Sequence, residues 1–432
     1  MLSLYVHIPF CNQKCKYCSF NIFPVNNLSN SQKIIDNYIA SLTKEINFYS
    51  DILAKPQIKS LYFGWWTPNK IWAQNIIKII DQIASKFDLE NLAELSFEFN
   101  PYPQQEIYSI IQELNNKYKS LARLRYSFWI QSLDNKILQQ SWRETTFIWL
   151  VEFLRWLRDI KQSNNLFNFD FIAFGKFNET RKWNQQLWDQ NTLNFFQDFV
   201  NSLFAESFSL YTLELFHWSL RYHEQLKWLS TTKTWWPSTF DLTTWRISND
   251  DDIYNEFSLL KDIILDSWYI RYELSNFSKL WKSSIHNRVY RNMENYIWLW
   301  VAWSSFLNSN IPNYQKIIKT INPDFDINNK WIRFTNTQNI TDYINWKIID
   351  PNNIQILNDD DYLIEKFFLW LRTDQWIDNI DEFTNILVPN YQSLIYSYQE
   401  QWFCTINDKK LKLTDQWMDV FNSIITDILN KI

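Results

Sequence analysis

Glycine is almost absent from this chain of 432 residues, which contains only Gly64 and Gly175. At the usual share of about 7%, a chain of this length would contain roughly 30 glycines. Turns with a positive φ angle strongly favour glycine, so two glycines are too few for a large fold. The chain contains 25 tryptophans instead, and some stand where turns are expected, as Trp235 and Trp236 do before Pro237. We therefore hypothesise that the gene uses UGA as a glycine codon, as some bacterial lineages do, and has been translated with UGA as tryptophan.

The rest of the composition is that of a globular protein. Hydrophobic residues make up 46% of the chain, and its length allows one large domain plus a smaller one. The net charge of -5 argues against a nucleic-acid-binding surface. The sequence shows neither an apolar run of membrane-spanning length nor a basic-then-apolar leader. We therefore expect a cytoplasmic protein with at most peripheral membrane association.

Strand-like and helix-like segments alternate through the first half of the chain. Strands are expected at residues 2–8, 58–63, 94–99, 123–130, 167–174 and 207–215. Helices are expected at 31–49, 69–87, 103–118, 135–161, 181–203 and 253–267, followed by a strand-like segment at 269–277. Repeated β-α units predict parallel strands with right-handed crossovers, in either a doubly wound sheet or a barrel.

The pattern changes in the last third of the chain. An Asn-rich connector begins near Asn310, and short helices are expected from Asp360. A hairpin is predicted to turn at Asn407–Asp408, before a helix capped by Thr414. Helices followed by a hairpin resemble a winged-helix module. We therefore divide the chain into a core domain (1–230), a barrel extension with the connector (231–340) and a C-terminal domain (341–432).

Three of the four cysteines, Cys11, Cys15 and Cys18, form a C-x3-C-x2-C motif on the loop after the first strand. Three thiolates on one short loop can ligate three corners of a [4Fe–4S] cluster and leave the fourth iron open. The alternative is a zinc site with His7 or Cys404 as the fourth ligand. The spacing favours the cluster, and Cys404 is then expected to be a small core residue.

Residues 5–20, "YVHIPFCNQKCKYCSF", resemble the radical S-adenosylmethionine (SAM) superfamily and are most similar to its coproporphyrinogen III oxidase-like branch. The resemblance implies an α/β fold, a partial (β/α)6 TIM-like barrel with a C-terminal helical domain. It also implies a [4Fe–4S] cluster whose open iron binds SAM. One electron, from a donor such as flavodoxin or ferredoxin, then cleaves SAM to a deoxyadenosyl radical.

Further segments match the family in chain order. With tryptophan read as glycine, Gly64, Trp65, Trp66 and Thr67 match its GGGTP segment, whose backbone lies close to SAM. The resemblance assigns further SAM-site residues: Tyr5, Glu98, Gln131, Arg143 and Asp170. Their plain alternatives are packing for Tyr5, strand-end carboxylates for Glu98 and Asp170, and surface positions for Gln131 and Arg143. Strand ends are where barrel sites form, which favours the functional interpretation.

Two departures from the branch favour its heme chaperone (HemW) subgroup. Phe20 stands where the coproporphyrinogen dehydrogenases carry a fourth cysteine, and Tyr5 lies almost at the start of the chain. The subgroup's H-N-x-x-Y-W segment implies His286 as a heme ligand, although Arg291 replaces the final aromatic residue. The implied partners are heme and an acceptor haemoprotein. The alternative function is oxygen-independent oxidative decarboxylation of the propionates of coproporphyrinogen III.

Overall fold

The structure of the chain is a computed structural model. It describes every residue except 12–13, 19–22, 25–30, 65–70, 176–188, 215–240, 243–244, 247–249, 300–303, 325, 327, 338, 379, 385–396, 402, 422–424 and 426–432. Trp65, Trp66 and Thr67 therefore lie outside the described residues, as does Phe20.

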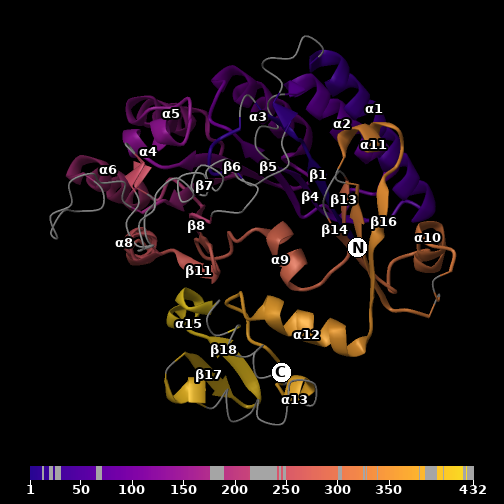
Figure 1. Ribbon diagram of the computed structural model, residues 1–432. Coiled ribbons are helices and arrows are strands. Elements are labelled where there is room, and N and C mark those ends of the chain that lie inside the picture. Colours follow the sequence, from indigo (N-terminus) through magenta and orange to yellow (C-terminus); the bar gives the residue numbers. More distant parts are fainter. Residues whose placement is uncertain are drawn as a thin grey trace.

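A twelve-stranded sheet forms the centre of the described part of the molecule (Figure 1). Its strand order is β11-β12-β8-β7-β6-β5-β4-β1-β13-β14-β15-β16. Neighbouring strands from β8 to β13 run parallel, and the strands beyond them on both sides are antiparallel. The parallel strands are β1 (Leu2–His7), β4 (Ile58–Gly64), β5 (Glu94–Phe99), β6 (Arg123–Gln131), β7 (Asn165–Ala173), β8 (Ser207–Thr212) and β13 (Tyr296–Leu299). The antiparallel strands are β11 (Ile270–Glu273), β12 (Asn276–Ser278), β14 (Ser304–Asn308), β15 (Trp331–Asn336) and β16 (Ile349–Leu357).

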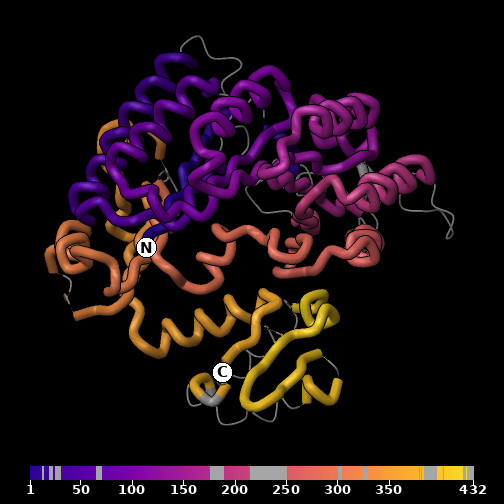
Figure 2. Tube along the Cα trace, turned by 180° about the vertical axis from the view of Figure 1, so that it is seen from behind, coloured from indigo at the N-terminus to yellow at the C-terminus, as the bar shows by residue number. Residues whose placement is uncertain are grey.

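Helices between the parallel strands cover the outer face of the sheet (Figures 1 and 2). They are α1 (Ser31–Ile52), α2 (Ala73–Lys86), α3 (Gln104–Tyr118), α4 (Asn135–Gln140), α5 (Phe147–Ile160), α6 (Gln190–Asn201) and α8 (Asp250–Asp266). Strand alternation explains the layering. Phe128 packs edge-on against Phe153 of α5, and Phe169 packs likewise against Phe199 of α6. The polar residues next to these phenylalanines in sequence point to the opposite, concave side of the sheet.

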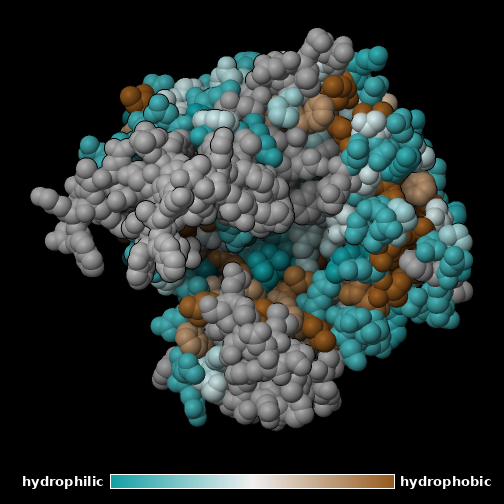
Figure 3. Space-filling model, viewed as in Figure 1, coloured by the Kyte–Doolittle hydropathy of each residue, from teal (hydrophilic) through white to brown (hydrophobic). Residues whose placement is uncertain are grey.

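A C-terminal module with its own core lies beside this sheet (Figure 1). It contains α12 (Asp359–Trp370), α13 (Asp381–Thr384), the hairpin β17 (Cys404–Asn407) and β18 (Lys410–Leu413), and α15 (Asp415–Asp419). The predicted hairpin is present, but the positive φ angles of its turn fall at Asp408 and Lys409, one residue later than expected. Thr414 caps α15 as predicted. Figure 3 shows a hollow between the module and the barrel, with polar surface within it.

Buried ion pairs join the module to the sheet. Asp419 lies 2.5 Å from Lys261 Nζ and 2.6 Å from Arg271 Nη1, and the three side chains are at most 9% exposed. Arg288 of α9 (Ile285–Arg291) pairs with Asp374 at 3.2 Å. The Asp419 pairs thus link the two cores through buried charges, and the Arg288–Asp374 pair adds a partly exposed contact.

The chain between the barrel and the module is more ordered than the sequence suggested. The expected Asn-rich connector contains α10 (Tyr314–Ile321), α11 (Ile340–Ile344), β15 and β16. The expected single strand at 269–277 is the β11–β12 hairpin, because the chain turns at Leu274 and Ser275. Two-stranded pairs β2 (Phe10–Cys11) with β3 (Phe23–Pro24), and β9 (Asp241–Leu242) with β10 (Trp245–Arg246), complete the described elements. The domain boundaries at 230 and 340 stay a prediction. Among the described residues, no helix is long and apolar enough to cross a membrane.

Tryptophan occupies backbone positions that normally belong to glycine. Five tryptophans have φ angles between 58° and 70°: Trp72, Trp142, Trp268, Trp281 and Trp346. A positive φ angle is unfavourable for a bulky residue. The same five side chains are 41% to 87% exposed, so packing does not compensate for the strain. This supports the hypothesis that these positions encode glycine.

Candidate functional site at the carboxyl ends of the parallel strands

Tyr5 of β1 contacts Gly64 of β4 near the carboxyl ends of these two neighbouring strands. In the β1–β4 register His7 is opposite Gly64 and Tyr5 is opposite Tyr62. A Cβ atom added to Gly64 would lie 2.4 Å from Tyr5 Oη, so only glycine fits beside this ring. Tyr5 also stacks on Trp298, with ring centroids 3.9 Å apart. The structure therefore shows a steric reason for glycine at position 64.

Glu98 lies near the end of β5, on the same concave side. The hydroxyl of Tyr62 donates a hydrogen bond of 2.5 Å to Glu98 Oε1. Burial, and then the Glu98 carboxylate, raise the pKa of Tyr62 well above its ordinary value, so this phenol stays a donor. Tyr62 thereby fixes the orientation of the Glu98 carboxylate.

Asp170 of β7 is held by a group of short polar side chains. Ser127 Oγ donates to Asp170 Oδ2 at 2.6 Å, and Asn168 Nδ2 donates to Oδ1 at 2.9 Å. Asn168 also donates to Ser209 Oγ at 3.0 Å, which extends the group to β8. Burial raises the pKa of Asp170, and the hydrogen bonds from Ser127 and Ser209 partly oppose that rise. The carboxylate is therefore a fixed acceptor in a mostly buried polar setting.

Gln131 and Arg143 lie at and beyond the end of β6. Gln131 has a φ angle of 68°, is 3% exposed, and its Oε1 has no hydrogen-bond partner among the described residues. Arg143 donates from Nη2 to the carbonyl of Trp129 at 2.6 Å and to Asn100 Oδ1 at 3.2 Å. Its guanidinium also hydrogen-bonds Cys15. A strained, buried amide with an unsatisfied acceptor is typical of a binding site.

The three cysteines of the motif are buried next to this guanidinium. Cys11, Cys15 and Cys18 are 4%, 5% and 0% exposed. Burial raises the pKa of Cys15, and Arg143 opposes that rise. Cys404, in contrast, belongs to the separate core of the C-terminal module, where burial raises its pKa to about 12. Cys404 is therefore a core residue and not a fourth ligand.

The donor set of this loop suits an iron–sulfur cluster. Three buried thiols on one loop, beside a cation, are the residue types that hold one. Over the described ranges, no group of three or more His, Cys, Asp or Glu side chains is arranged as a metal site. The residue types of this loop therefore fit a cluster.

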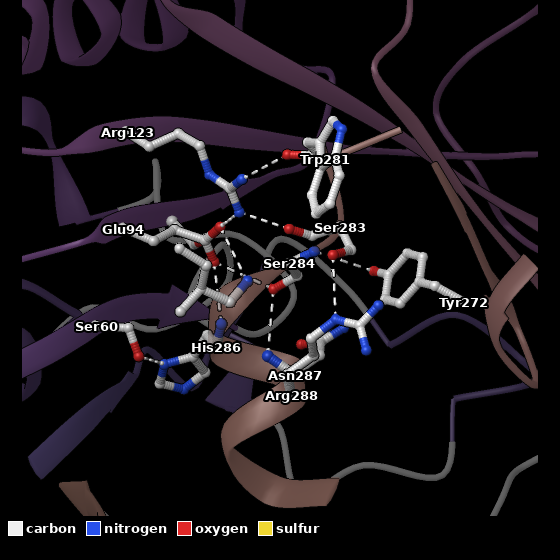
Figure 4. Close-up of polar contacts among 12 residues, drawn as sticks. Ser60, Glu94, Arg123, Tyr272, Trp281, Ser283, Ser284, His286, Asn287 and Arg288 are labelled. Carbon is white, nitrogen blue, oxygen red and sulfur yellow. Dashed lines mark hydrogen bonds and ion pairs between the residues drawn. The ribbon is translucent and has the colours of Figure 1, made fainter. Parts of the chain in front are cut away.

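His286 lies on α9, and its ring points toward Ser60 of β4 (Figure 4). It is 1% exposed, its Nδ1 lies 2.8 Å from Ser60 Oγ, and its Nε2 lies 2.6 Å from Tyr290 Oη. Its ring centroid is 5.0 Å from that of Tyr62, so it belongs to the same group of side chains. Burial lowers the pKa of His286 to about 3, so the imidazole is neutral at ordinary pH.

Glu94 fixes the start of this helix. Its carboxylate accepts hydrogen bonds from the backbone N–H groups of Ile285 and His286 and from Ser284 Oγ, at 3.1 to 3.2 Å (Figure 4). Arg123 also pairs with Glu94 at 2.5 Å. Burial alone would raise the pKa of Glu94, but Arg123 and Arg125 outweigh it and hold the pKa at about 2. The carboxylate therefore stays charged and anchors α9 to the barrel.

Sequence reasoning did not find several residues that position the site: Ser60, Tyr62, Arg125, Ser127, Asn168, Ser209 and Tyr290. The alternation of β5 to β7 could have indicated some of them, because Arg125, Ser127 and Asn168 interrupt apolar strands at every second position. Ser60 and Tyr290 gave no comparable signal.

Comparison with known proteins identifies the family. Residues 5–181 match the model of the radical SAM superfamily. Residues 5–181 thus belong to the radical SAM superfamily. It is 23% identical to the heme chaperone HemW of Buchnera aphidicola subsp. Schizaphis graminum over 83% of this chain and 80% of that protein. It is 24% identical to the heme chaperone HemW of Lactococcus lactis over 99% of this chain and 97% of that protein.

A solved structure shares the fold of this radical SAM protein. It is the coproporphyrinogen III oxidase HemN from Escherichia coli, described as a radical SAM enzyme. The TM-score is 0.71 at 15% identity, over 99% of this chain and 89% of that one. The expected α/β fold, with its parallel sheet, is thus confirmed, and the radical SAM protein is of the HemW type by distant, nearly full-length similarity.

Proposed function

We propose that this radical SAM protein binds heme and delivers it to an acceptor haemoprotein. The observation that carries the proposal is the similarity to the Lactococcus lactis heme chaperone over 99% of this chain. Phe20, in place of a fourth cysteine, supports the same choice. The acceptor, an electron donor such as flavodoxin or ferredoxin, and a cytoplasmic location all stay predictions.

Cys11, Cys15 and Cys18 would hold the [4Fe–4S] cluster, which when bound supplies an electron for the cleavage of SAM. The residues of this chain would bind and orient SAM. Glu98 and Asp170 offer fixed acceptors for its hydroxyl and amino groups, and the free Oε1 of Gln131 offers another. Arg143 offers a cation for its carboxylate beside the cysteine loop.

His286 is the proposed heme ligand. A neutral imidazole is the form that ligates iron, and the lowered pKa keeps His286 neutral. Its Nε2 is hydrogen-bonded to Tyr290, so iron ligation through this nitrogen has to replace that contact. Tyr290→Phe should therefore free Nε2 and strengthen heme binding, whereas His286→Ala should weaken it.

The second candidate is coproporphyrinogen III dehydrogenase activity, which the likeness to the HemN fold favours. It would use the same concave site for hydrogen abstraction from two propionates. Fold alone does not fix function, so the activity must be measured.

The deciding experiment is anaerobic incubation of the reconstituted protein with SAM, a reductant and coproporphyrinogen III. The chaperone proposal expects no protoporphyrinogen, together with stoichiometric heme binding that His286→Ala weakens. Formation of protoporphyrinogen would replace the proposal by the second candidate. Heme binding that is unchanged in His286→Ala would keep the chaperone proposal and remove the ligand assignment.

A further inference from the structure

A cavity of about 640 Å³ lies between the end of the sheet and the C-terminal module. Ile356 and Leu357 of β16 form one wall, and Phe368 of α12 and Phe421 of the module form others. Its size is that of a small-molecule site, and its lining combines these apolar side chains with Asp361, Glu365, Gln355 and two arginines. It is distinct from the concave site, since none of its lining residues is among the predicted SAM or heme residues.

Among the described residues, no hydrogen bond or ion pair joins the second cation of the lining, Arg372, to a carboxylate. Arg333, the other arginine of the lining, is paired with Glu365. The structure gives Arg372 no side-chain hydrogen bond or ion pair with a described residue, and its Nε is buried without a hydrogen-bond partner. Its guanidinium carbon lies 5.1 Å from the ring centroid of Phe421.

The surroundings of Arg372 favour the binding of an anion. Burial and the like charge of Arg291 lower the pKa of Arg372, and the carboxylates of Glu273 and Glu214 only partly oppose this. A partly buried, unpaired guanidinium gains more from a carboxylate than a solvated one does. Apolar walls next to such a cation suit an apolar molecule that carries a carboxylate at its edge.

We propose that this cavity binds a tetrapyrrole edge-on, with a propionate on Arg372 and the ring edge against Phe368 and Phe421. The choice of a tetrapyrrole over another apolar carboxylate rests on the proposed function. The described residues that line the cavity include no His, Cys or Met. Binding here therefore does not depend on iron, unlike ligation by His286.

The test uses the full-length protein and metal-free protoporphyrin IX, and binding is followed by the change in the fluorescence of the porphyrin itself. Arg372→Gln should weaken binding about tenfold or more, as expected for the loss of a charged hydrogen bond. Arg372→Lys keeps the charge but loses the planar fork of donors, so its affinity should fall between those of the wild type and Arg372→Gln. Arg155→Gln, which changes an exposed arginine of α5, is the matched control and should bind as the wild type does.

Protoporphyrin carries no iron, so its binding does not report ligation by His286, and this separates the cavity from the proposed heme ligand. Equal affinities of the wild type and a correctly folded Arg372→Gln protein would overturn the inference. Binding of palmitate with no binding of protoporphyrin would also overturn the tetrapyrrole assignment. If heme is never passed to an acceptor but protoporphyrin binding still depends on Arg372, the proposed function fails and this site stands.

Discussion

Tyr62 and Glu98, on neighbouring strands β4 and β5, are joined by a hydrogen bond of 2.5 Å. The phenol is held as a donor, so Glu98 presents its remaining acceptor capacity to the concave side. Tyr62→Phe removes this donor and leaves the ring in place. We expect the SAM dissociation constant to rise about three- to tenfold, the usual effect of one hydrogen bond. Isothermal titration of the reconstituted protein measures it.

Tyr49→Phe is the matched control for that prediction. Tyr49 is also a buried tyrosine, but among the described residues its hydroxyl has no hydrogen-bond partner. Its replacement should not change SAM affinity. Equal affinities in both variants would show that Tyr62 does not position Glu98 for SAM.

The cysteine loop gives a second prediction. Replacing Cys11, Cys15 or Cys18 by Ala should abolish a reconstituted cluster of about four irons per chain, because three thiolates are needed to hold it. Cys404→Ala should retain the iron, since Cys404 belongs to the core of the C-terminal module. Iron analysis and visible absorption spectra measure both. One equivalent of tightly bound zinc without iron would contradict the cluster assignment.

The tryptophans with positive φ angles give a third prediction. Trp268 and Trp281 are 87% and 84% exposed at φ angles of 70° and 65°. Replacing either by Gly should raise the free energy of unfolding by about 1 kcal/mol, because the backbone strain disappears and little packing is lost. Urea denaturation measures the change.

Trp331 provides the comparison for these two positions. It stacks on Tyr362 with ring centroids 4.2 Å apart, and its φ angle is not positive. Trp331→Gly should lower the free energy of unfolding by about 2–4 kcal/mol. Stabilisation at 331, or destabilisation at 268 and 281, would contradict the argument. The codons test the recoding hypothesis directly, since UGG at the positive-φ tryptophans would refute it.

Glu45, buried in α1, gives a prediction on pH. It accepts hydrogen bonds from Tyr343 Oη at 2.6 Å and Asn336 Nδ2 at 3.0 Å, and burial raises its pKa to about 8. The folded state therefore keeps a proton that the unfolded chain loses near pH 4.5. This contribution to stability is complete at low pH and declines from about pH 4.5 to 8, by up to about 1.4 kcal/mol per pH unit.

Glu45→Gln should flatten this dependence, because an amide keeps a neutral polar group at the site without a proton to lose. Glu90→Gln, at an exposed position, should leave the curve of the wild type unchanged. Unfolding free energies measured by urea denaturation between pH 5 and 8 compare the three proteins. A wild-type curve that rises over this range would contradict the raised pKa.

The barrel could be predicted from the sequence because its strands and helices alternate with clear periods and intervening turns. The strands β15 and β16 could not, since they lie in the Asn-rich connector and form by pairing outward from β14, which itself pairs with β13. Strand-end residues such as Glu98 and Asp170 were found through a resemblance to known motifs. The contact between His286 and Ser60 joins residues 226 positions apart, which local pattern cannot indicate. Which side chains hydrogen-bond to one another depends on strand register and packing, and these are known only from the three-dimensional structure.

The carboxylate of Asp419 serves two cations, Lys261 of α8 and Arg271 of β11, and all three side chains are nearly buried. Replacement of Asp419 alone by a neutral residue would leave two buried positive charges without a counter-charge. This typically lowers the free energy of unfolding by about 3–5 kcal/mol. Loss of either cation would leave the other to balance the carboxylate. Among relatives of this chain, position 419 should therefore tolerate change least, and a neutral residue there should occur together with neutral residues at positions 261 and 271. We therefore expect these three positions to change together in evolution, although they belong to two different cores.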